Sequence, residues 1–147
     1  MIYHFFVFLQ EHAGKLSQCC LELSETIKED AWCDFMDILV AISKSQVGIL
    51  LENFQSNLLR IFNGVVQDNS RAQLTCRRLR VLSHLVVNHT ESLFKVGRAY
   101  AELNGQGFEE VMDRLFDVWL EKIDCMALAD KKLSSIVLIS LLPLKMR

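Results

Sequence analysis

The 147-residue sequence has few residues that break helices and no sign of β-structure. It contains one proline, Pro143, so proline forces no break in the chain upstream of that position. No alternation of apolar and polar residues is sustained, and no asparagine–glycine hairpin joins two such runs. Because 51% of the residues are nevertheless hydrophobic, enough apolar surface is present for a packed core. These features favour an all-α fold.

The sequence also lacks the motifs of metal sites and of common enzymes. Its five cysteines include no C-x-x-C pair, and its four histidines include no H-E-x-x-H. Neither a phosphate-binding G-x-x-x-x-G-K loop nor a G-x-S-x-G nucleophile turn occurs. Cys33 could pair with a distant histidine as a nucleophile, but no neighbouring residue would activate it. We therefore expect no catalytic residue, cofactor or metal, and we interpret the cysteines as buried apolar side chains of a reducing compartment.

Charge and hydropathy exclude two further classes of partner. The net charge is −2, which gives no overall attraction to nucleic acid or to an anionic membrane. Apolar runs fall short of the roughly 18–20 residues that span a bilayer. The opening run MIYHFFVFL lacks a basic start and a small-residue cleavage site, so it predicts an ordinary helix rather than a signal peptide.

Apolar periodicity predicts seven helices. Capping boxes at Thr26 with Glu29 and at Ser70 with Gln73 are expected to open two of them, and Gly105 to close the fifth. The first five span about residues 5–23, 29–44, 47–66, 71–87 and 91–103, and the last two fall within 108–142.

The last two helices differ in character. The first has one apolar stripe and is expected to bury one face, with Trp119 at the middle of the stripe. The stripe consists of Phe108, Met112, Leu115, Trp119, Ile123 and Met126. The second is apolar in nearly every direction, so it is expected to be covered on most sides. One amphipathic helix backed by one apolar helix is typical of a stacked α-solenoid.

An internal repeat supports the same fold. Three leucines of the fourth helix lie 43 residues after apolar residues of the second helix. The pairs are Leu82 with Leu39, Leu79 with Met36 and Leu85 with Ile42. HEAT-type repeats are about 40–47 residues long. We therefore predict an α-solenoid of about three HEAT-type helical hairpins, with repeats at about 5–44, 47–103 and 108–142. Three repeats are close to the minimum for a stable stack, and we expect a segment of a longer solenoid.

Two of the predicted helices carry matched stripes of opposite charge. The fourth helix has Gln73, Arg77, Arg80 and His84 at i, i+4, i+7 and i+11. The equivalent positions of the second helix hold Asp30, Asp34 and Asp37. By segment, residues 1–45 have net charge −4, residues 46–103 have +3 and residues 104–147 have −1. These seven residues are either solvated faces that pair across neighbouring helices or a concave surface that binds a protein partner.

The end of the sequence resembles a known family. The runs Trp119 to Asp124, Lys131 to Ser134 and Leu138 to Pro143 are similar to late HEAT repeats of the importin-beta family, most of all to its importin-eleven branch. The similarity continues, more weakly, back to about Phe6. Its specificity lies in its length rather than in any short motif.

This resemblance implies a nuclear transport receptor, or karyopherin. Such a protein carries protein cargo between cytoplasm and nucleus, through the pores of the nuclear envelope, under the control of the Ran GTPase. The resemblance implies that the second, fourth and seventh helices face cargo and that the first, third and sixth face nucleoporins. The family's Ran contact lies in amino-terminal repeats outside this match. A HEAT-repeat scaffold outside transport is the alternative, and a small all-α enzyme is a third possibility.

Overall fold

The computed structural model describes residues 2–23 and 29–145, and every regular element in these ranges is helical. The all-α prediction is therefore confirmed. The elements are α1 (Ile2–Leu23), α2 (Glu29–Asn53), α3 (Gln55–Gln67), α4 (Ala72–Asn88), α5 (Ser92–Asn104), α6 (Phe108–Lys122), a 3-10 turn (Ile123–Cys125) and α7 (Leu128–Lys145).

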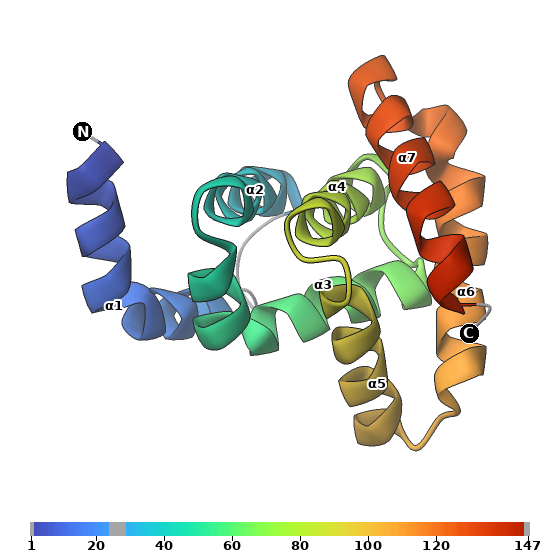
Figure 1. Ribbon diagram of the computed structural model, residues 1–147, viewed down its shortest axis with the longest axis horizontal. Coiled ribbons are helices and arrows are strands. Elements are labelled where there is room, and N and C mark those ends of the chain that lie inside the picture. The colour runs from blue at the N-terminus through green and yellow to red at the C-terminus, as the bar shows by residue number, and fades with distance from the viewer. Residues whose placement is uncertain (1, 24–28, 146–147) are drawn as a thin grey trace.

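The helices form two rows (Figure 1). One row consists of α2, α4 and α7, and the other consists of α1, α3 and α6, with each helix in contact with the next in its row. The contact between α2 and α4 is the most extensive in the molecule. The extra helix α5 packs on α3 and α6, and in the view of Figure 1 it lies below α3 and beside the lower part of α6. Helices stacked in two rows, each contacting its neighbours, are the architecture of a helical-repeat solenoid.

The predicted break between the second and third helices falls within α2. Gln46 has non-helical backbone angles, φ −152° and ψ 65°, where two helical segments of α2 meet. Beyond it, the Phe54 amide donates to the Leu50 carbonyl at 3.0 Å, and the Leu58 amide donates to the Phe54 carbonyl at 2.9 Å. Because helical hydrogen bonding crosses Phe54, α3 continues the segment that begins after Gln46. The predicted third helix at 47–66 therefore matches the backbone.

The matched apolar positions of α2 and α4 lie in the core, with one exception. Leu39 and Leu82 are fully buried, as are the other leucine, methionine and isoleucine pairs of the repeat. Ile38 is 52% exposed, whereas Val81 at the matched position of α4 is buried. Among the described helices, α4 has row neighbours on both sides and α2 has one only. The difference in packing explains the difference in burial.

One predicted helix end is confirmed and one predicted helix cap is wrong. Gly105 ends α5 with a left-handed backbone, φ 62°, which glycine adopts without strain. The Ser70–Gln73 capping box does not form. The helix α4 begins at Ala72, and no side chain caps its first turn. The Ser70 hydroxyl instead accepts a hydrogen bond from Arg78 Nη1 at 2.9 Å. The predicted box at Thr26 lies outside the described residues.

The last two helices confirm one expectation and correct another. Trp119 is fully buried, so the apolar stripe of α6 does face the core. The prediction that α7 is covered on most sides is wrong, because Ile136 and Ile139 are 64% and 68% exposed. One face of α7 packs against α4 and the 3-10 turn, and Ser134 of α7 accepts a hydrogen bond from Trp119 of α6. The helix also continues through Pro143 to Lys145, two residues beyond the proline.

Candidate protein-binding surface

The predicted site residues lie on neighbouring helices of one row. Asp34 and Asp37 belong to α2, while α4 carries the other four residues of the charged stripe, Gln73, Arg77, Arg80 and His84. Asp34, Asp37 and Gln73 are exposed, and the remaining three are half-buried. Asp30 lies in the first turn of α2, and its side chain is outside the described part of the chain.

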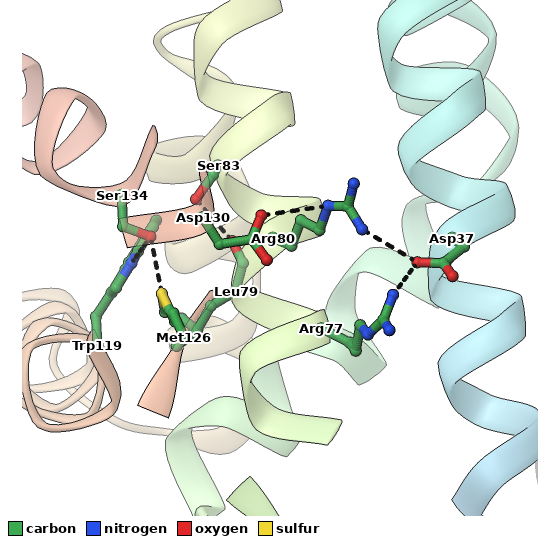
Figure 2. Close-up of polar contacts among 9 residues, drawn as sticks. All are labelled: Asp37, Arg77, Leu79, Arg80, Ser83, Trp119, Met126, Asp130 and Ser134. Atoms are coloured by element: carbon green, nitrogen blue, oxygen red, sulfur yellow. Dashed lines mark hydrogen bonds and ion pairs between the residues drawn. The ribbon is translucent and has the colours of Figure 1, made fainter. Parts of the chain in front are cut away.

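The structure joins the two halves of the charged stripe through ion pairs (Figure 2). Arg77 Nη1 donates to Asp37 Oδ1 at 2.7 Å. Arg80 Nη1 donates to the same oxygen at 3.5 Å. On its other side, Arg80 Nε forms an ion pair with Asp130 Oδ1 of α7 at 3.4 Å, although no hydrogen bond is made there. Arg80 therefore bridges α2 and α7, the two neighbours of its own helix.

These ion pairs join charges at matched positions of α2 and α4 to each other. Asp37 lies 43 residues before Arg80, so a repeat-matched pair of opposite charge meets across the α2–α4 interface. The arginine side chains are about a third exposed and Asp37 is nearly half exposed. Pairs this accessible to water contribute less than about 1 kcal/mol each. They link α2, α4 and α7 across the row and supply little of the stability.

Among the described stripe residues, Asp34 and Gln73 are exposed and take no part in these ion pairs. Asp34 forms no ion pair with any described residue, and the Gln73 side chain forms no hydrogen bond with one. Gln73 lines a cleft of about 450 Å³ between α4 and the start of α7, whose walls include Arg77, Arg80 and Asp130. The stripe therefore combines an exposed acidic position on α2 with a polar cleft beside α4.

His84 adds no charge to this surface at neutral pH. Burial lowers its pKa below the ordinary 6.5, and the positive charges of Lys44 and Arg80 lower it further. Asp130 acts in the opposite direction, but with a smaller effect. A half-buried neutral imidazole suits packing and hydrogen bonding better than electrostatic recognition of a partner.

Sequence reasoning missed Asp130 and two cysteines that reach the same cleft. Cys76 of α4 and Cys125 of the 3-10 turn both line it. The interpretation of the cysteines as buried side chains is wrong for Cys19 and Cys125, which are exposed, and the other three are half-buried. The 43-residue offset could not reveal Asp130, because the inserted α5 changes the spacing between the second and third repeats.

The described residues contain no group of three or more histidine, cysteine or acidic side chains that could hold a metal ion. Cys33, the one nucleophile considered from the sequence, is half-buried on α2. Burial raises the pKa of the Cys20 and Cys76 thiols, which lowers the fraction of reactive thiolate. Within the same described ranges, no helix is long and apolar enough to cross a membrane.

Two rows of stacked helices with a polar, ion-paired surface along one row define a helical-repeat protein. Residues 6–147 match the family described as importin-11-like, TPR repeats, and the chain belongs to this family. The 43-residue offset between α2 and α4 is longer than the 34 residues of a tetratricopeptide repeat and lies within the HEAT range.

The chain is also similar to a curated protein. It is 23% identical to Importin-11 of Mus musculus over 137 residues, which are 92% of this chain. The chain spans about 14% of the length of that relative. No solved structure matches it.

Proposed function

We propose that this chain is part of a nuclear transport receptor that binds protein cargo and takes part in Ran-dependent import into the nucleus. The observation that carries the proposal is the family match, which extends over residues 6–147 and so includes nearly every helix. The two-row architecture supports it, because stacked repeats offer the long surfaces on which proteins are bound. The proposal places the protein in both cytoplasm and nucleus, and at the nuclear envelope during passage.

The cargo surface that we propose is the charged stripe along α2 and α4. A partner there meets the exposed carboxylate of Asp34 and the cleft beside Gln73. Arg77 and Arg80 line the same cleft, so an acidic group of the cargo could share them with Asp37. The row α1, α3 and α6 is the proposed side for nucleoporins, and the Ran contact is expected in repeats other than these.

The experiment compares two double variants that change the stripe in different ways. Replacing both Arg77 and Arg80 with glutamate should lower partner affinity and melting temperature, because repulsion around Asp37 then takes the place of the ion pairs. Changing Asp34→Lys with Gln73→Glu alters only exposed groups outside those pairs, so it should lower affinity at an unchanged melting temperature. Lys15→Glu with Lys95→Glu is the charge control for the arginine variant, because it makes the same change in net charge at two exposed lysines of other helices.

Because the Ran contact is expected in other repeats, the variants are made in a full-length receptor that contains this segment, and partner binding is measured by capture from cell extract with and without a GTP-locked Ran. The transport function would be supported if the amount of captured nuclear protein falls when GTP-locked Ran is added. The same amount should fall when Asp34→Lys and Gln73→Glu are introduced together. Capture of the fixed subunits of one assembly, insensitive to Ran, would instead support the scaffold function. Binding that neither stripe variant changes would exclude the stripe as the cargo surface.

A further inference from the structure

The cleft between α4 and the 3-10 turn brings two cysteines of different helical elements together. It holds about 450 Å³, and half-buried Cys76 of α4 and exposed Cys125 of the turn both line it. The Cys76 thiol donates a weak hydrogen bond to the Lys122 carbonyl oxygen, with 3.8 Å between sulfur and oxygen. Lys122 directly precedes the turn, and a carbonyl in a 3-10 turn points toward the residue three positions later, which is Cys125. The Cys76 sulfur therefore lies against the short stretch of backbone that carries the second thiol.

The pKa of Cys76 also indicates that the two thiols are close. Burial raises the pKa of the Cys76 thiol, and a negative charge on Cys125 raises it further. Lys122 lowers this pKa and Asp130 raises it, both with smaller effects. Exposed charges separated by more than about 8–10 Å are largely screened by salt. An effect of Cys125 on Cys76 therefore agrees with the shared cleft and the shared backbone contact.

Helix geometry sets the remaining cysteines apart from this pair. Cys19 and Cys20 are adjacent on α1, and successive residues of a helix point in directions about 100° apart. Their sulfurs therefore do not face each other, although the two residues are neighbours in the sequence. Cys33 packs against the hydrophobic core from α2. Cys76 and Cys125 are thus the pair that two separate elements place at one cleft.

We propose that Cys76 and Cys125 form a reversible disulfide when a peroxide oxidises this protein, and that the bond holds the cleft between α4 and the turn closed. Cys125 is the more exposed of the two residues, so its sulfur reacts with the peroxide first. The O–O bond breaks, and one oxygen stays on Cys125 as a sulfenic acid. The other oxygen leaves as water with the proton of the Cys125 thiol.

The second step joins the two sulfurs. The Cys76 sulfur attacks the sulfenic sulfur of Cys125, the S–O bond breaks, and the oxygen leaves as water with the Cys76 proton. Two thiols and one peroxide thus give one disulfide and two water molecules, with the sulfurs oxidised and the peroxide reduced. The closeness of the two residues offsets the small thiolate fraction of Cys76, because an attack within one protein has a high effective concentration. A dithiol reductant restores both thiols by exchange.

The disulfide ties the turn that precedes α7 to α4. Bonded cysteines keep their Cα atoms about 4.4–6.8 Å apart, so the spacing of the two elements is fixed at this point. Gln73 and Arg77 line the same cleft, and the bond leaves less room beside them. Cys76 and Cys125 are 49 residues apart in the sequence, so the bond also closes a long loop and restricts the unfolded chain. This chemistry needs neither cargo nor Ran, so it is tested separately from the proposed function.

The first test maps the bond in the folded 147-residue protein. The reduced protein is treated with a small excess of hydrogen peroxide, the remaining thiols are blocked, and unreduced peptides are identified by mass spectrometry. The main cross-linked species should join the peptides of Cys76 and Cys125 within one chain, and dithiothreitol should remove it. The same treatment in urea should give mixed pairings, because the unfolded chain no longer holds the two sulfurs together. Absence of the cross-link, a different main pair or a disulfide between two chains would overturn the proposal.

The second test measures whether the bond stabilises the protein and whether it needs Cys125. Oxidation should raise the melting temperature by about 5–15 °C, since the bond restricts the unfolded chain. Cys125→Ser changes an exposed residue, and it should abolish both the cross-link and the rise in melting temperature. Cys19→Ser with Cys20→Ser is the matched control, because it removes two thiols of another helix and should keep both effects. An equal rise in Cys125→Ser, or loss of the rise in the control, would overturn the proposal.

Discussion

Replacing Trp119 with alanine should remove a large part of the stability of this protein. The indole of Trp119, on α6, is fully buried. Its Nε1 donates a hydrogen bond to the Ser134 hydroxyl at 3.0 Å, and that hydroxyl lies 3.4 Å from the Met126 sulfur (Figure 2). Trp119 therefore joins both helices of the last hairpin through packing and through a buried polar contact.

The expected loss can be worked from these contacts. Truncating a fully buried tryptophan costs about 3–5 kcal/mol, because apolar burial is lost and a cavity remains. Ser134 keeps Met126 as a partner for its hydroxyl, so the lost hydrogen bond adds little more. Since domains of this kind are stable by about 5–15 kcal/mol, Trp119→Ala should leave a protein close to the limit of folding.

Two variants separate the packing from the hydrogen bond. Ser134→Ala keeps the indole but leaves its buried N–H without an acceptor, which should cost about 1–3 kcal/mol. Trp32→Ala is the matched control, because Trp32 is only half-buried and packs edge-on to Phe35 at 5.5 Å between ring centroids. It should cost clearly less than Trp119→Ala.

The measurement is urea denaturation followed by helical circular dichroism, with the slope of each curve compared between variants. A common slope permits the midpoints to be read as changes in stability. A loss below about 1 kcal/mol for Trp119→Ala would refute the reasoning, since no fully buried tryptophan is expected to cost so little. Equal losses for Trp32→Ala and Trp119→Ala would likewise contradict the burial described above.

Two further changes test other parts of the fold. A Cβ at Gly97 would lie 2.7 Å from the Met112 sulfur, whereas nothing lies within 4 Å of one at Gly48. Both alanine variants gain helix propensity, so Gly97→Ala should be less stable than Gly48→Ala by about 1–3 kcal/mol in urea denaturation. For His84, whose pKa is lowered in the folded state, the unfolded chain binds more protons near and below pH 6.5. Melting temperature should therefore fall as the pH drops through this range, and His84→Gln should flatten that part of the profile.

Periodicity alone identified the secondary structure and much of the core. Helical spacing predicted the burial of Trp119 and of the leucines at the 43-residue offset, and the structure confirms both. It could do so because a residue's place on a helix face follows from 3.6 residues per turn, whatever the helix packs against. The end of α5 at Gly105 could be predicted in the same way, because it depends on the backbone conformation of that one residue.

Tertiary structure decided which faces are covered and which charges meet. The apolar face of α7 that carries Ile136 and Ile139 was expected to be buried, but it has no neighbour among the described helices. Arg77 and Arg80 were recognised as one stripe, yet their pairing with Asp37 and Asp130 depends on where α2 and α7 lie against α4. The sequence sets the pattern on each helix, and the packing of three helices sets whether that pattern is an interface, an ion pair or an exposed face.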